Sequence, residues 1–320
     1  MKQPLKRALF VGINTYDNDK ELACCVNDAL AMKDMLARHE NNEPNFSCKT
    51  LTSDKMRITT ERLSKDIQNL MSDLPGGDLL FYFSGHGHVT EQGGYLRTQD
   101  ATEENPGFPM SELLALANNA NVDSVLLILD CCHSGAIGDS TDSESQITLS
   151  EGVTILASSD PGQESEQDFE YSVFTELMLG ALDGGATDIR GLVSAASMYA
   201  YVEAALGSWD QRPMYKSHAR TLEPIRECNP IVSDETLRQL TSYFRFTEMK
   251  FQMDPSFEYT TDDCVPENIK IFDRFKELRN AGLLQGTDGK DLYWAAIESG
   301  TVELTNLGKF YWRLVSNDKI

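Results

Sequence analysis

The sequence of 320 residues has no Lys or Arg from Thr98 to Ile189, a window that holds 18 Asp and Glu residues. The whole chain is acidic as well, with a net charge of −22. Such a chain repels nucleic-acid phosphates, so we expect no nucleic-acid partner, but protein or peptide partners with basic residues. The acidic window is either solvated loop or the mark of an enzyme that keeps its preferred basic residues out of its own active-site loops.

The chain also lacks long apolar runs and a disulfide pattern. No stretch approaches 18 apolar residues, and the first residues lead into a strand without the apolar core of a signal peptide. Seven cysteines, an odd number that includes the pairs Cys24-Cys25 and Cys131-Cys132, fit a reducing compartment. We therefore predict a cytoplasmic protein with no membrane partner.

Two segments have the pattern of buried parallel strands with polar residues at their ends. Residues 124–129 are followed by Asp130, Cys131 and Cys132, and residues 78–83 are followed by Ser84, Gly85 and His86. Continuous apolar runs are typical of strands covered on both faces, and such sheets carry their functional groups at the carboxyl ends of the strands. The 46 residues from His86 to Cys132 leave room for one crossover helix. We therefore expect these two strand ends to meet.

A Cys with a His about 50 residues upstream is the spacing of caspase-type nucleophilic catalysis. The two strand ends read Ser84-Gly85-His86-Gly87 and Asp130-Cys131-Cys132-His133-Ser134-Gly135. Together they resemble the paired motifs of the caspase-like cysteine peptidases, most closely the metacaspases and their bacterial relatives, the orthocaspases. The resemblance covers roughly residues 5–220. It implies an α/β fold, a three-layer sandwich with a mostly parallel sheet.

The expected chemistry follows from side-chain alternation along the strands. Residues two apart share a face, so Asp130 lies on the side of Cys132, and Ser84 on the side of His86. Cys132 would attack as a thiolate, and His86 would return the proton to the leaving amine. The resemblance implies that the backbone N–H groups of Gly87 and Cys132 form the oxyanion hole.

The neighbouring Cys131 should face away from the site and pack as a small hydrophobic residue. A zinc site built from the cysteines and histidines of both motifs is the alternative reading. The chain has no Cys-x-x-Cys spacing, which argues against such a site.

Substrate preference is inferred from the segment Cys25-Val26-Asn27-Asp28-Ala29. It is similar to a metacaspase segment, and by that resemblance the first specificity pocket consists of Cys25, Asp28, Ser84 and Asp130. Two carboxylates in a closed pocket require a cation, so cleavage should follow Arg or Lys. The alternative for Asp28 is an ordinary helix N-cap.

The chain changes character after residue 222, and we predict two domains, residues 1–222 and 223–320. The second begins with helices and continues with an expected hairpin over residues 283–294 that turns at Asp288-Gly289, followed by a closing helix. This order suggests a small winged-helix-like α+β module. Its acidic charge disfavours DNA, so we expect a regulatory surface for an activating or restraining protein partner.

The leading hypothesis is therefore a cysteine endopeptidase specific for Arg or Lys. The resemblance suggests a role in bacterial stress, defence or cell death. The alternative is a catalytically silent caspase-like adaptor that binds partners through its C-terminal domain. The complete set of His86, Cys132 and pocket acids favours the enzyme, because an adaptor does not need all of them.

Many metacaspases require calcium, and Asp100 and Asp139 match two of the calcium-binding positions in that family. The acidic pair expected before the next helix is replaced here by Pro109-Met110-Ser111. We therefore predict no cofactor and calcium-independent activity, with equal peptidase rates in a calcium chelator and in millimolar calcium. Activity that is lost with the chelator and restored by calcium would contradict this prediction.

Overall fold

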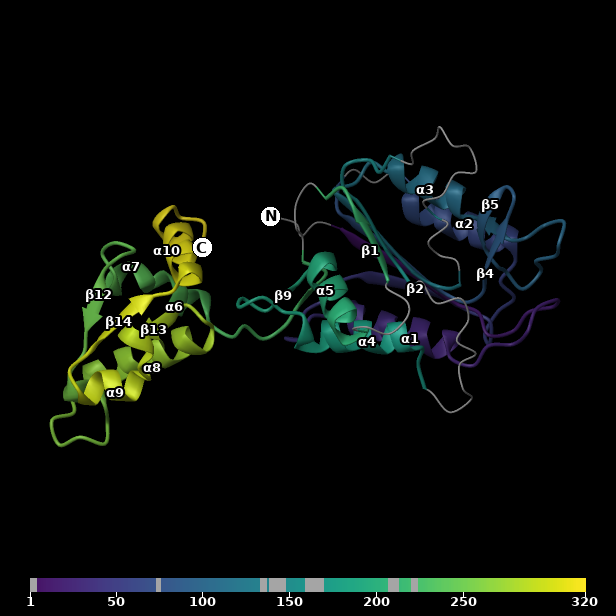
Figure 1. Cartoon of the computed structure of the whole chain (residues 1–320). Coiled ribbons are helices and arrows are strands. Elements are labelled where there is room, and N and C mark those ends of the chain that lie inside the picture. The colour runs from purple at the N-terminus through teal and green to yellow at the C-terminus, as the bar shows by residue number, and fades with distance from the viewer. Residues whose placement is uncertain are drawn as a thin grey trace. The chain divides into compact units, whose positions relative to one another are not determined.

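The computed structural model describes residues 5–72, 76–132, 137, 148–158, 170–206, 213–219 and 224–320, apart from the side chain of Asp288. The chain divides into two compact units (Figure 1). The first comprises Met1–Thr187 and Leu192–Cys228, and the second Asp188–Gly191 and Asn229–Ile320. Within the described ranges, no helix has both the length and the apolar character needed to cross a bilayer.

A central sheet organises the first unit. In the described part of this unit its strands are, in spatial order, β10 (Met214–Ser217), β8 (Val153–Ala157), β7 (Ser124–Asp130), β3 (Asp78–Ser84), β1 (Lys6–Gly12) and β2 (Ser47–Thr52). Neighbouring strands are parallel except for the edge pair β10 and β8. The predicted mostly parallel sheet is confirmed, and β3 and β7, which precede the two sequence motifs, lie side by side at its centre.

Helices cover both faces of this sheet (Figure 1). One face carries α1 (Cys25–Ala37), α4 (Val173–Gly180), its π-helical continuation η2 (Ala181–Gly185) and α5 (Ala195–Leu206). The other face carries α2 (Thr60–Met71) and α3 (Met110–Asn118). The predicted three-layer α/β sandwich is therefore confirmed.

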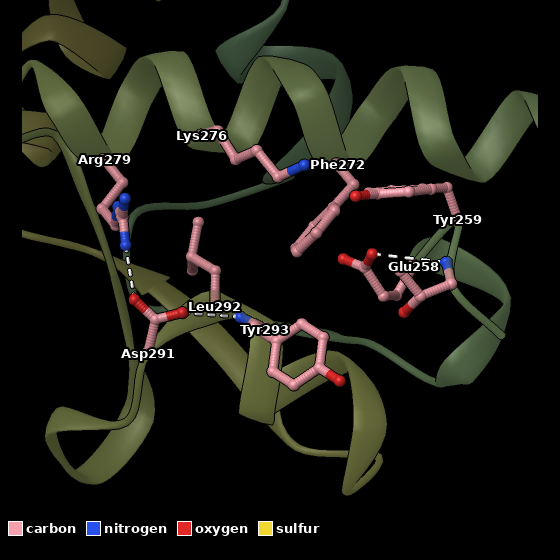
Figure 2. A pocket seen from close by; sticks show the side chains of 9 residues that line it. Glu258, Tyr259, Phe272, Lys276, Arg279, Asp291, Leu292 and Tyr293 are labelled. Atoms are coloured by element: carbon pink, nitrogen blue, oxygen red, sulfur yellow. Dashed lines mark hydrogen bonds and ion pairs between the residues drawn. The ribbon is translucent and has the colours of Figure 1, made fainter.

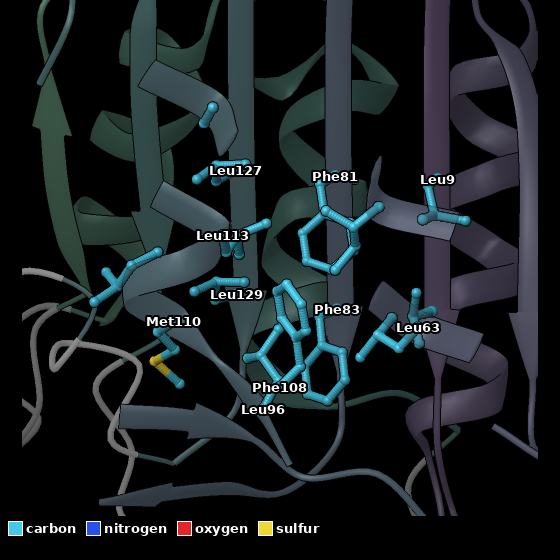
Figure 3. Packing of buried hydrophobic residues seen from close by; sticks show 14 of the residues in the cluster. Leu9, Leu63, Phe81, Phe83, Leu96, Phe108, Met110, Leu113, Leu127 and Leu129 are labelled. Carbon is cyan, nitrogen blue, oxygen red and sulfur yellow. The ribbon is translucent and has the colours of Figure 1, made fainter. Parts of the chain in front are cut away.

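Strand β3 shows why residues 79–83 form a continuous apolar run. All seven of its residues are buried, and alternate side chains enter different cores. Phe81 and Phe83 pack with Leu9 and Leu127 beneath α2 and α3 (Figure 3), whereas Tyr82 packs on the side of α1 and α4. Each buried side chain of this size contributes about 1.5–3 kcal/mol, so the strand cannot shift its register without losing both cores.

Short strands occur over residues 87–109, which include a connection, residues 92–108, that has the composition of a long polar loop. β4 (Gly87–Thr90), β5 (Gly93–Leu96) and β6 (Phe108–Pro109) form a small antiparallel sheet. Leu96 and Phe108 from this sheet are fully buried in the core below α3 (Figure 3). Two isolated apolar residues in a polar stretch gave too weak a periodic signal to predict these strands.

Another short pair shapes the end of the first unit. β11 (Arg226–Glu227) pairs antiparallel with β9 (Leu192–Val193), which keeps the chain in this unit up to Cys228. The boundary that we inferred from sequence lies between residues 222 and 223, which are outside the described residues.

The second unit alternates helices with a three-stranded sheet. In its described residues the elements are α6 (Asp234–Arg238), α7 (Leu240–Tyr243), β12 (Lys250–Gln252), η3 (Pro255–Phe257), α8 (Pro266–Asn280), β13 (Leu284–Gly286), η4 (Thr287–Gly289), α9 (Leu292–Ile297), β14 (Thr301–Leu304) and α10 (Asn306–Ser316). The sheet is antiparallel, in the order β12-β14-β13. Phe244, Phe272 and Phe275 are buried at the centre of its core.

The predicted hairpin over residues 283–294 is wrong. Strand β13 ends at Gly286, and the chain then forms η4 and α9 before β14 returns as the partner of β13. Asp291 starts α9 because its side chain accepts a hydrogen bond from the Tyr293 N–H, and Leu292, Ala295 and Ala296 bury one face of the helix. The likeness to a winged helix stays a prediction.

Candidate active site

The site begins where β3 and β7 end. These strands pair in parallel register, which sets Ser84 opposite Asp130, and the Gly85 N–H donates a hydrogen bond to the Asp130 carbonyl at 3.3 Å. His86 and Cys132 each lie two residues beyond this pair. Both catalytic candidates therefore leave the sheet at the same edge, from neighbouring strands.

Gly87 shows how closely the two chain segments approach. A β-carbon at this position would lie 1.9 Å from the Cys132 carbonyl oxygen and 3.3 Å from the Cys131 sulfur. Only a glycine fits there without moving one backbone away from the other. The residue after His86 is thus in contact with the backbone of Cys132.

The imidazole of His86 is oriented by a backbone carbonyl. Its Nε2 lies 2.7 Å from the Lys20 carbonyl oxygen, and its ring packs against Tyr16 at a centroid distance of 4.7 Å. The His86 N–H also donates to the Tyr16 hydroxyl at 2.8 Å. Because a carbonyl oxygen can only accept, this contact requires the proton on Nε2. In the neutral ring, Nδ1 is then the nitrogen that can accept a proton from a thiol.

The two adjacent cysteines differ in environment. Cys131 is buried in the core cluster beneath α3, and this burial raises the pKa of its thiol well above the usual range. A thiol of this kind stays protonated and is a poor nucleophile. The structure therefore agrees with the expected structural role of Cys131, while Cys132 lies at the strand end and is only partly buried.

Two carboxylates come together beside the strand ends. Asp28 is fully buried and accepts hydrogen bonds from the Ser84 hydroxyl at 2.9 Å and from the Ser172 N–H at 3.0 Å. Asp130 accepts hydrogen bonds from the Thr175 hydroxyl at 2.7 Å and from the Ser172 hydroxyl. The predicted pocket residues Asp28, Ser84 and Asp130 are thus brought together, and the N-terminus of α4 holds both acids.

Burial dominates the electrostatics of this pair. Burial first, and the nearby charge of Asp130 second, raise the pKa of Asp28 to about 7. Cys25, at the start of α1, is also buried, and desolvation raises the pKa of its thiol well above the usual range. Two neighbouring acids in a low-dielectric site are costly to ionise together. This arrangement suits a ligand that brings a positive charge.

The alternative role of Asp28 as a helix cap is wrong. Helix α1 begins at Cys25, its N-cap is Cys24, and no side chain caps it. Asp28 lies within the first turn, and its carboxylate bonds to Ser84 on β3 and to Ser172 before α4. Its position is therefore explained by contacts between separate elements.

Sequence reasoning missed the groups that support the site. The Lys20 carbonyl and Tyr16 lie in an early polar loop whose contact with His86 has no signal in the sequence. Ser172 is the N-cap of α4 and accepts a hydrogen bond from the Thr175 N–H, so its capping role was detectable. The hydrogen bonds from the Ser172 and Thr175 hydroxyls to Asp130 depend on the tertiary fold, so the sequence does not predict them.

The calcium candidates divide between described and undescribed parts of the chain. Asp100 lies at the N-terminus of α2 in space, where its Oδ1 accepts from the Thr98 hydroxyl at 2.7 Å and from the Thr60 N–H at 2.9 Å. Asp139 and His133 are outside the described residues. Across the described ranges, no group of three or more His, Cys, Asp or Glu side chains is placed to hold a metal ion.

Comparison with known proteins identifies the fold family. A family model described as the caspase domain matches residues 5–223. The chain belongs to the caspase-domain family. Metacaspase-5 of Trypanosoma brucei brucei is 31% identical over 153 residues, which are 42% of this chain and 29% of that protein. These matches confirm the metacaspase-type resemblance of the motifs.

Other metacaspases show a similar partial match. Metacaspase-1 of Scheffersomyces stipitis is 34% identical over 101 residues, 28% of this chain and 25% of that protein. Metacaspase-4 of Arabidopsis thaliana is 27% identical over 205 residues, 58% of this chain and 45% of that protein. The chain therefore spans less than half the length of these curated relatives.

A solved structure supports the fold alone. The structure of a protein from Geobacter sulfurreducens aligns with a TM-score of 0.52 at 19% identity, covering 71% of this chain and 100% of that chain. At this identity the likeness extends to the arrangement of strands and helices.

The raised pKa of Asp28 predicts an unusual pH dependence of stability. Between pH values near 3.8 and 7, folded Asp28 keeps a proton that the unfolded chain releases, so stability falls as the pH rises through this window. We expect the thermal midpoint of the wild type to drop by several degrees relative to Asp28→Asn from about pH 5 to about pH 8. Parallel melting curves for the two proteins across this range would show that Asp28 is ionised throughout.

Proposed function

We propose that this protein is a cysteine endopeptidase that cleaves after Arg or Lys, with Cys132 as nucleophile and His86 as its acid–base partner. The single observation that carries the proposal is the parallel register of β3 and β7, which ends in the backbone contact of Gly87 with Cys132. Membership of the caspase-domain family supports the same chemistry.

The proposed reaction proceeds through an acyl enzyme. The Cys132 thiolate attacks the scissile carbonyl carbon, a C–S bond forms, and the C–N bond breaks as His86 gives a proton to the leaving amine. A water molecule, deprotonated by His86, then hydrolyses the thioester and restores the thiol. The Lys20 carbonyl fixes the Nε2 proton, so the transfers run through Nδ1.

The oxyanion that forms in both steps needs preorganised donors. We propose the backbone N–H groups of Gly87 and Cys132 for this role, because these residues lie against each other at the strand ends. The lack of a side chain at Gly87 is what lets these two backbone segments come so close.

The acid pair supports the choice of a basic residue before the cut. A guanidinium or ammonium group between Asp28 and Asp130 would lower the pKa of Asp28 and allow both acids to ionise. The Ser84 hydroxyl and the Ser172 N–H hold the Asp28 carboxylate in place through hydrogen bonds. The buried Cys25 completes the pocket wall in this proposal. An acidic side chain would be repelled by the same pair, so cleavage after Asp is disfavoured.

The biological setting is part of the proposal. The resemblance to orthocaspases supports a role in bacterial stress, defence or cell death. A cytoplasmic location is supported by the seven cysteines, which are free thiols in the structure.

A fluorogenic Arg peptide tests the nucleophile. We expect the wild type to hydrolyse it and Cys132→Ala to lose activity by about three orders of magnitude or more, as for other nucleophile deletions. Cys131→Ala is the matched control and should keep most of its activity, since that thiol lies in the core. A wild type inactive on Arg, Lys and neutral peptides would favour the silent adaptor, and equal losses in both variants would contradict the assignment of Cys132.

A second assay tests the pocket. Asp28→Asn removes one partner of a buried charge contact, which costs about 2–5 kcal/mol, so we expect kcat/KM for the Arg peptide to fall by about 30-fold or more. The matched substrate has norleucine, an uncharged chain of similar length, before the cut, and its kcat/KM should change little. If both substrates lose activity equally, Asp28 serves the fold rather than the recognition of charge.

A further inference from the structure

A pocket in the second unit has no role in the proposed peptidase. Its volume is about 280 Å³ and its walls come from the loop after η3, from α8 and from α9 (Figure 2). Glu258, Phe272 and Tyr293 bound it, together with Tyr259 and Leu292. The pocket lies wholly within one unit, so its function can be argued from that unit alone.

The cations on the pocket wall already have partners. Arg279 forms an ion pair with Asp291 (Figure 2). Lys276 pairs with Asp273 at 3.2 Å, and its ammonium lies 4.4 Å from the centroid of the Phe272 ring. These basic groups are therefore compensated and do not call for an anionic ligand.

Glu258 is different, because it is buried and weakly compensated. Its exposed fraction is 3%, and the one hydrogen bond that its carboxylate accepts from the described residues comes from the Thr260 N–H at 3.4 Å. No Lys or Arg of the described chain forms an ion pair with it. A buried carboxylate with so little support favours a cation from outside.

The aromatic residues around this carboxylate fit the same ligand. In Figure 2 the Glu258 carboxylate points toward the rings of Phe272 and Tyr293, and Tyr259 lines the same pocket. Tyr259 and Tyr293 are exposed by 68% and 39%, so neither is held there by burial in the core. Aromatic faces attract cations, and a ring of them beside a carboxylate selects an ammonium or guanidinium group.

We propose that this pocket binds a Lys or Arg side chain presented by a protein partner. A volume of about 280 Å³ accommodates one long side chain, with its stem on Leu292 and the rings and its charge at Glu258. The exposed acids Asp262, Asp263 and Glu267 follow on the same loop and helix start, and they favour a basic segment around the inserted residue. The proposed binding does not require Cys132, so this pocket would serve a silent adaptor and an active peptidase equally.

The test uses the full chain with Cys132→Ala, so that no basic probe is cleaved. The probes are N-acetyl-arginine amide, its norleucine counterpart and its glutamate counterpart. The readout is the NMR resonance of the Thr260 amide, which donates to Glu258 and reports on this pocket rather than on the active site. We expect the Arg probe to shift this resonance saturably and the other two probes to leave it in place.

Variants in this background separate binding from folding. We expect Glu258→Gln to weaken the Arg probe by about tenfold or more, as for loss of a charge-assisted hydrogen bond. Tyr259→Ala and Tyr293→Ala remove exposed rings and should each weaken it by about threefold, as for a cation–π contact, even if the Glu258 variant fails to fold. Glu235→Gln, an exposed acid on α6 outside the pocket, is the matched control and should bind as the parent does.

Three outcomes of these binding experiments would contradict the proposal. Equal affinity for the Arg and norleucine probes would show a purely apolar pocket and overturn the proposal. A preference for the glutamate probe would mean that Lys276 and Arg279 select an anion. Unchanged binding in both Tyr variants would likewise exclude this pocket as the cation site.

Discussion

The parallel pairing of β3 with β7 is the constraint on which the whole site depends. Both strands are apolar along their length because each face lies under helices, and this double burial fixes their register. The register sets Ser84 opposite Asp130, and the chain after each strand carries His86 and Cys132 away from the same edge. A shift of one residue would turn Phe81 and Phe83 out of their core. The same shift would move His86 away from Cys132.

The buried acids add a second constraint that works against stability. Asp28 lies in a site where burial raises its pKa to about 7, and its hydrogen bonds to Ser84 and Ser172 offset only part of that cost. Such strain at a site is typical of groups poised for a ligand. In the proposed peptidase, the cation of the substrate offsets the cost of ionising the two acids. The cation site proposed in the second unit likewise has a buried carboxylate, that of Glu258, on its wall.

Much of the first unit could be predicted because its signals are local and repeated. Residues 79–83 and 125–129 are continuous apolar runs, so the two motif strands and the mostly parallel sheet could be predicted from the sequence. The short strands of residues 87–109 were not, because Leu96 and Phe108 are single apolar residues in a polar stretch. The prediction of a hairpin over residues 283–294 was wrong. Asp288-Gly289 is a turn signal in the sequence, but the N-cap at Asp291 starts α9 instead of a second strand.

The site residues that belong to sequence motifs could be predicted. The backbone groups and distant side chains that form hydrogen bonds with them could not. Asp28, Ser84 and Asp130 were placed by resemblance, and the structure brings them together through α1, β3 and β7. The Lys20 carbonyl has no side-chain identity to recognise, and the contacts of Ser172 and Thr175 with Asp130 join residues more than 40 positions apart.

The central claim is that Cys132 is the sulfur nucleophile activated by His86. Covalent labelling with an Arg-based acyloxymethyl ketone, followed by peptide mapping, tests it most directly. The account predicts alkylation of Cys132 alone, much faster than with an Asp-based reagent, and strongly slowed in His86→Ala. Labelling of Cys131 or Cys264 in place of Cys132, or an unchanged rate without the imidazole, would contradict it.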